Sequence, residues 1–102
     1  NLLLMSGQVG NDASGKCPED FTEQFRLAFQ NIEAILTEAG GDLSNIVELT
    51  SYHIGMREHL REFIAVKDEM ISEPYPAWTA IGCTELAMPG AVVEIRAQAV
   101  LS

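Results

Sequence analysis

The chain has 102 residues, 47% of them hydrophobic, and its 15 acidic against 6 basic residues give a formal net charge of −9. This length is typical of one domain that cannot bury a large core alone, so we expect a single domain over residues 1–102 that gains stability by association. The charge disfavours nucleic acid and anionic membranes as partners, because both repel an acidic surface. No apolar run approaches the roughly 20 residues that a membrane-spanning helix needs.

The cysteine and histidine content predicts no metal ion, no cofactor and no disulfide framework. Cys17 and Cys83 lie far apart in the sequence and outside any Cys-x-x-Cys pattern. The two histidines, His53 and His59, fit no standard ligand spacing, and His53 within an apolar run is typical of a core histidine. This usage fits a reducing compartment, so we expect a cytoplasmic protein.

The first half of the chain predicts a strand followed by a long helix. Residues 2–9 are apolar and rich in strand-forming types, and a loop rich in Gly, Asn and Asp follows them. Asp20, with Glu23 three residues later, resembles a capping box. Apolar residues at helical spacing then predict a helix over residues 21–39, which the glycine pair at 40–41 ends.

The second half predicts a strand, a helix and two further strands. The β-branched and aromatic run 46–54 is typical of a strand, and residues 57–71 form an amphipathic helical pattern that ends before Pro74. Residues 77–85 and 91–101 predict the last two strands, with Pro89 and Gly90 suited to the centre of a type II turn between them. The predicted order is β-α-β-α-β-β.

Two helices can cover only one face of such a sheet. Alternation along the 46–54 strand places Val47, Leu49, Ser51 and His53 on one face. Along the last strand, one face is apolar and the other is mixed, with Val92, Glu94, Arg96, Gln98 and Val100. A mixed face is expected at a subunit interface that holds water or ligand, although a solvent-facing sheet would show the same pattern.

Several segments, in this order and spacing, resemble one known family. They are Leu4-Met5-Ser6-Gly7-Gln8-Val9, Asn31-Ile32-Glu33-Ala34-Ile35-Leu36, Ala39-Gly40, Ile46-Val47, the run from Pro74 to Gly82 and the run from Met88 to Val100. The resemblance is to the Rid family, the reactive intermediate/imine deaminases, also described as endoribonuclease L-PSP-like proteins. It implies a chorismate-mutase-like α+β fold with two helices on one face of a mixed sheet. It also implies a homotrimer with a small-molecule cleft between neighbouring subunits, and a further N-terminal strand segment that this chain lacks.

The resemblance also assigns residues to that cleft. Ser6 and Gly7 match residues that line it, and Glu94 matches the acidic residue thought to position or activate water on the substrate. Trp78 stands where the deaminases carry the arginine that grips the substrate carboxylate. An indole offers one neutral donor, whereas a guanidinium offers two parallel charge-assisted bonds, so we expect Trp78 to form a cleft wall with an apolar face and an N–H donor. Efficient hydrolysis of simple imino acids is therefore not expected.

Lys67 is the feature that the residues themselves single out. On a helical wheel it falls near the middle of the apolar stripe of the 57–71 helix, with the other charged residues, Asp68 among them, on the opposite side. A lysine is almost never fully buried without a partner. Its stem could pack on apolar surface while the ammonium reaches water or an interface. Alternatively, Lys67 anchors an anionic ligand in place of the missing arginine, at a position where the family deaminases usually have an asparagine, or forms a Schiff base with a carbonyl compound.

These observations favour a Rid-like protein whose cleft is lined by Ser6, Gly7, Lys67, Trp78 and Glu94 and takes a small carboxylate, keto or imino compound. Whether such a protein hydrolyses its ligand is left open by the sequence, so a non-catalytic binding or sensing role is the first alternative. Glu94 equally suits an ordinary outward-facing carboxylate of a strand. Some relatives have been described as endoribonucleases or translation inhibitors, a role that the acidic charge opposes, and a structural or chaperone-like role is the residual possibility.

Overall fold

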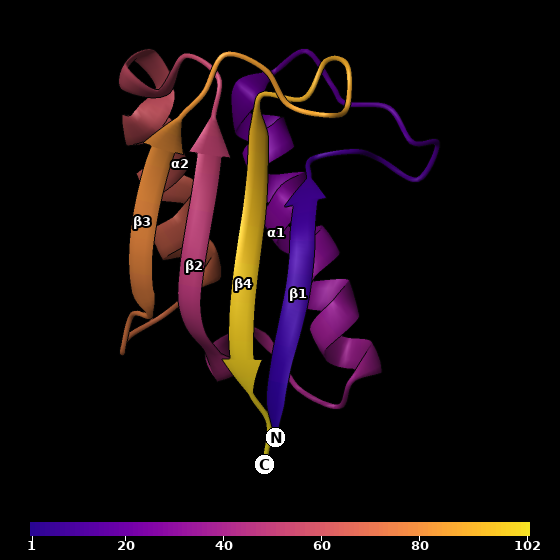
Figure 1. The fold of residues 1–102 in the computed structure, drawn as a ribbon, viewed down its shortest axis with the longest axis vertical. Helices are drawn as coiled ribbons and strands as arrows, with labels where there is room; N and C mark the ends of the chain where they lie inside the picture. The colour runs from indigo at the N-terminus through magenta and orange to yellow at the C-terminus, as the bar shows by residue number, and fades with distance from the viewer.

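The computed structural model describes residues 1–102, all of the chain. Its elements are β1 (Leu2–Val9), α1 (Phe21–Glu38), a 3-10 turn η1 (Leu43–Asn45), β2 (Ile46–His53), α2 (Met56–Met70), β3 (Ala77–Gly82) and β4 (Val93–Val100). The strands form one sheet in the order β1-β4-β2-β3, in which β2 and β3 are parallel and the other neighbours antiparallel. Both helices lie behind one face of this sheet, so the expected α+β architecture is confirmed (Figure 1). Neither helix is long and apolar enough to cross a bilayer.

The last two strands are not neighbours in the sheet, because β2 lies between β3 and β4 (Figure 1). The predicted type II turn does form: the Ala91 N–H donates to the Met88 carbonyl at 3.1 Å, and Gly90 has φ +85°. It belongs to a crossover connection and not to a hairpin. Both strands are accordingly shorter than predicted, since the crossover occupies residues 83–92.

Local signals account for the ends of α1. The Asp20 carboxylate accepts a hydrogen bond from the Thr22 N–H at 3.3 Å, so the predicted cap forms, whereas the reciprocal bond that a capping box needs from Glu23 is absent. At the other end Gly40 has φ +88°, and the Gly41 N–H donates to the Leu36 carbonyl at 2.8 Å.

The core lies between the helices and one face of the sheet. Its strand side is supplied by alternate residues of β4, all at most 1% exposed: Val93, Ile95, Ala97 and Ala99. The prediction for β2 was wrong at one position. Val47 is 46% exposed and Ile46 only 5%, because the pairing register with β4 shifts between Ile46 and Glu48 and this irregularity reverses the alternation.

His53 is a polar member of this core, with 2% of its surface exposed. The rings of Phe25 and Phe63 pack edge-on against the imidazole, with centroids 6.3 Å and 4.6 Å away. Burial disfavours the charged imidazolium, and it lowers the pKa of His53 from 6.5 to about 4. His53 is therefore neutral at physiological pH.

The junction between β1 and α1 tolerates only glycine at position 10. A Cβ atom there would lie 2.0 Å from the backbone oxygen of Gln24. We expect Gly10→Ala to lower the free energy of unfolding by about 2–4 kcal/mol, because backbone must move to relieve this overlap. Gly82→Ala is the matched control, since a Cβ atom there would lie 3.7 Å from Cε of Met56, an ordinary van der Waals contact. Urea unfolding measures both, and equal stabilities would contradict the assignment.

His53 makes stability depend on pH in a defined window. Between pH 6.5 and about 4 the unfolded chain binds a proton at this ring that the folded chain does not, so stability falls as the pH is lowered through this range. We expect the natural chain to lose about 3 kcal/mol across the window relative to His53→Phe, which keeps the aromatic packing. Urea unfolding of both proteins at a series of pH values tests this. Parallel pH profiles would contradict it.

Candidate functional site

Trp78 lies on the helix-covered side of β3, where it is half-buried. It pairs in register with Leu49 of β2, and its ring packs on Phe63 of α2 with centroids 5.8 Å apart. The indole Nε1–H donates to the Ser51 hydroxyl oxygen at 2.8 Å. The only N–H donor of Trp78 is therefore occupied within the chain and is not free for a ligand.

Ser51 joins Trp78 to the core histidine. Its hydroxyl is fully buried and lies 2.7 Å from Nε2 of His53 as well as 2.8 Å from the indole nitrogen. The hydroxyl accepts the indole proton and can give its own to the imidazole, so both bonds are satisfied when Nδ1 of His53 carries the ring proton. The signal for this link was visible in the sequence as two polar residues, two positions apart, on an otherwise apolar strand face.

Lys67 is buried on the same side, with 7% of its surface exposed. Its ammonium donates to the Asp68 carboxylate at 2.8 Å, and Nζ lies 5.0 Å from the Trp78 ring centroid and 5.1 Å from that of Tyr75. Asp68 was predicted on the opposite side of the helix, but the long lysine side chain reaches round to it. The ammonium is therefore held by one carboxylate and two aromatic faces. The contact with Tyr75 had no signal in the sequence, because this residue lies in the loop before β3.

Ser6 and Gly7 lie within β1, at a β-bulge. The register passes from Met5 opposite Ala97 to Gln8 opposite Ile95, so the two intervening residues together face the single residue Arg96. Bulges are common beside functional sites because they redirect the local backbone. The strand continues through the bulge to Val9.

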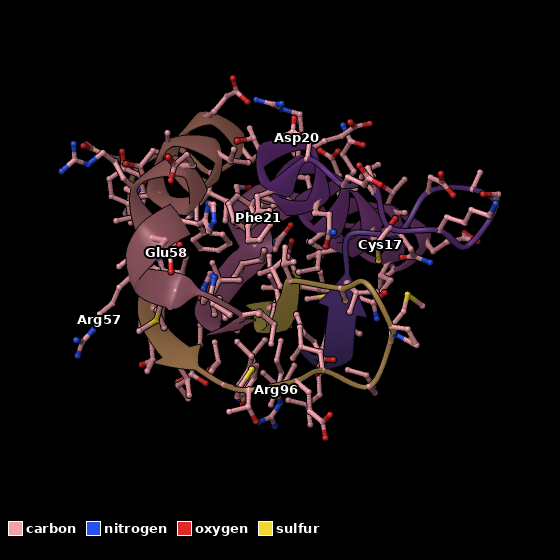
Figure 2. All side chains as sticks on the ribbon, turned by 90° about the horizontal axis from the view of Figure 1, so that it is seen from above. Cys17, Asp20, Phe21, Arg57, Glu58 and Arg96 are labelled. Carbon is pink, nitrogen blue, oxygen red and sulfur yellow. The ribbon has the colours of Figure 1, made fainter.

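Glu94 lies on the helix-free face, beside this bulge. A Cβ atom on Gly7 would lie 2.3 Å from Oε2 of Glu94, so the carboxylate occupies the space that the glycine leaves. Tyr52 of β2 is its direct cross-strand partner. Arg96, two residues along β4, projects from the same side of the sheet, away from the helices (Figure 2). Tyr52 and Arg96 were not among the predicted site residues, because strand order cannot be read from strand alternation.

The five predicted site residues therefore form two groups on opposite faces of the sheet. Lys67 and Trp78 lie on the helix side near the β3 edge, and Ser6, Gly7 and Glu94 lie near the β1 edge, with the last two in contact on the open face. A single chain does not bring Lys67 and Glu94 together, and the carboxylate partner of Lys67 is Asp68.

The hollows of the single chain lie elsewhere. The largest, of about 470 Å³, is bounded by residues 84–91 and Ile54. A second, of about 420 Å³, lies at the carboxyl end of β2 and β3 and is lined by His53, Arg57 and Cys83 among others. Cys83 is half-buried there. No group of three or more His, Cys, Asp or Glu side chains converges on one point.

Comparison with known proteins identifies relatives over almost the whole chain. The family model described as Endoribonuclease L-PSP matches residues 1–101. "RutC family protein YjgH" of Escherichia coli (strain K12) is 43% identical over 88 residues, which cover 85% of this chain and 67% of that protein. The "2-iminobutanoate/2-iminopropanoate deaminase" of the same organism is 28% identical over 104 residues, 98% of this chain and 78% of the enzyme.

A solved structure shows the same fold. RidA from the Antarctic bacterium Psychrobacter sp. PAMC 21119 superposes with a TM-score of 0.94 at 32% identity, covering 99% of this chain and 81% of that one. The sequence match and the shared fold cover the same residues, from β1 to β4. The chain belongs to the Rid family, the family of endoribonuclease L-PSP and the RutC proteins.

Proposed function

We propose that this chain is a cytoplasmic, homotrimeric Rid protein that binds a small carboxylate, keto or imino compound in a cleft between subunits. In this proposal Lys67 is the anchor for the carboxylate, Trp78 is a wall of the cleft, Ser6 and Gly7 line it, and Glu94 positions water on the ligand. The observation that carries the proposal is the buried ammonium of Lys67, held against the residue that replaces the family's arginine.

The placement of Lys67 supports the role of anion anchor. A buried ammonium with three protons has donors to spare once Asp68 has accepted one. The two aromatic faces keep the head group in place, because each ring attracts a cation that lies over it. A carboxylate that approaches the β3 edge would meet an ammonium that is already held in place. Binding would then not cost the side-chain entropy of ordering the lysine.

The division of the site residues supports a cleft made by two copies. Lys67 and Glu94 lie on opposite faces of one sheet, so both can contact one ligand only if they come from different subunits. The helix-free face also carries Leu2, Leu4 and Val100, each at least half exposed, which is typical of a surface that becomes covered on association.

A non-catalytic binding role is the second candidate, and the Trp78 hydrogen bond favours it. Imino-acid hydrolysis in the family uses an arginine to grip the carboxylate, and here the replacing indole has no free donor. Glu94 remains available for chemistry, so hydrolysis of a ligand that Lys67 can hold stays within the proposal. An endoribonuclease role is disfavoured, because a formal charge of −9 repels RNA.

Replacing Lys67 by methionine tests the anchor. Methionine fills a similar volume without charge, so we expect Lys67→Met to weaken binding of 2-oxobutanoate by about tenfold or more, the scale of a lost charge-assisted bond. Isothermal titration measures the affinity, and light scattering is expected to show an unchanged trimer. Lys16→Met is the matched control, since Lys16 is the only other lysine and is exposed. Equal affinities of Lys67→Met and Lys16→Met for 2-oxobutanoate would contradict the role of Lys67 as the anchor.

Restoring the family's arginine tests the chemistry. Short 2-imino acids generated in solution should decay faster with Trp78→Arg than with the natural chain, because the guanidinium supplies the bidentate grip on the carboxylate. Adding Glu94→Gln to Trp78→Arg should abolish that gain. Decay with the natural chain as fast as with Trp78→Arg would show instead that Lys67 already does the arginine's work in catalysis.

A further inference from the structure

The polar pair Ser51 and His53 has no packing reason to be polar. Both side chains lie at the core face of β2, 0% and 2% exposed, between Leu49 and the rings of Phe25 and Phe63. Burying hydroxyl and imidazole groups there costs free energy that apolar residues of similar size would not cost. The two side chains hydrogen-bond to each other, and Ser51 also accepts a hydrogen bond from the indole of Trp78.

We infer that Ser51 and His53 are positioning residues that orient the Trp78 indole, and through its ring the ammonium of Lys67, for binding a ligand carboxylate. Ser51 accepts a hydrogen bond from the only donor of the indole, and this bond restricts rotation about the χ1 and χ2 bonds of Trp78. His53 fixes the Ser51 hydroxyl in turn. The Trp78 ring so held lies 5.0 Å from the Lys67 ammonium. Only the ligand-binding consequence rests on the proposed function, since the orientation of Trp78 can be measured without a ligand.

Within the hydrogen-bonded link of Trp78, Ser51 and His53, the group that takes up a proton in acid is the His53 ring. An imidazolium at His53 donates to the Ser51 oxygen instead of accepting from the hydroxyl, so that oxygen must accept from both the ring and the indole while its own proton loses its acceptor in the core. The elements packed on His53 bring few charges to it. Phe25 of α1 and Phe63 of α2 are neutral, and Arg57 of α2 and Cys83 after β3 are the ionisable groups that line the same hollow. Acid should therefore loosen the hold of Ser51 on Trp78 before it unfolds the chain.

The experiment uses Trp78 as its own reporter, because it is the only tryptophan. Near-ultraviolet circular dichroism reports how rigidly the indole is held, and far-ultraviolet dichroism reports the fold. The proteins are the natural chain, Ser51→Ala, the conservative Ser51→Thr, which keeps a hydroxyl, and His53→Phe. Each is titrated from pH 7 to below the His53 pKa of about 4, and each is titrated with 2-oxobutanoate at pH 7.

In the natural chain we expect the tryptophan band to fade on acidification before the far-ultraviolet signal changes. In Ser51→Ala the band should be weak at pH 7 and binding of 2-oxobutanoate about fivefold weaker, the scale of one net hydrogen bond. Ser51→Thr should restore both, and in His53→Phe the band should no longer depend on pH.

Two results would overturn the inference. One is a Ser51→Ala protein whose tryptophan band and affinity equal those of the natural chain. The other is a natural chain whose tryptophan band and far-ultraviolet signal change together with pH. This second result would contradict the inference even if Ser51→Ala fails to fold. A natural chain that does not bind 2-oxobutanoate would count against the proposed function, while the pH and tryptophan signals would still decide the roles of Ser51 and His53.

Discussion

The uncovered face of the sheet is the constraint on which the rest of the structure depends. Two helices supply apolar surface for one side only, so the core forms there and the other side carries exposed leucine and valine beside polar residues. Every candidate for chemistry follows from this division. Residues that alternate along a strand lie in different environments, one dry and enclosed by the helices, the other open in the single chain.

The sequence predicted the elements well, because their signals are local. Helical spacing from Phe21, the Asp20 cap and the glycine pair at 40–41 act within one or two turns of backbone. The order of the strands in the sheet, in contrast, does not depend on local signals. That β2 lies between β3 and β4 depends on which strand edges meet after folding, and neither the Pro89 turn nor strand alternation carries that information. The misplacement of Val47 has the same origin, since a register shift is a property of the strand pair.

The sequence named candidate site residues but could not predict how they are arranged. Lys67 was recognisable because a charge in an apolar helical stripe needs an explanation whatever the fold. Its neighbours Asp68 and Tyr75 were not recognisable, because their contacts depend on side-chain reach and on a loop. The resemblance identified Trp78 as a changed position. Only the structure shows that the tryptophan at this position has an internal hydrogen-bond acceptor, the Ser51 hydroxyl. An arginine at this position would not use that acceptor in the same way.

The bulge at Ser6 and Gly7 has a second effect, on solubility. β1 is an outer strand of the sheet in this chain, and its first residues are the exposed apolar side chains Leu2 and Leu4. A long, regular, apolar edge is a template on which strands of other molecules can add. The bulge bends the strand and breaks the even spacing of its backbone groups, so the regular stretch is short. The bulge that leaves room for the Glu94 carboxylate beside Gly7 thus also limits uncontrolled growth of the sheet.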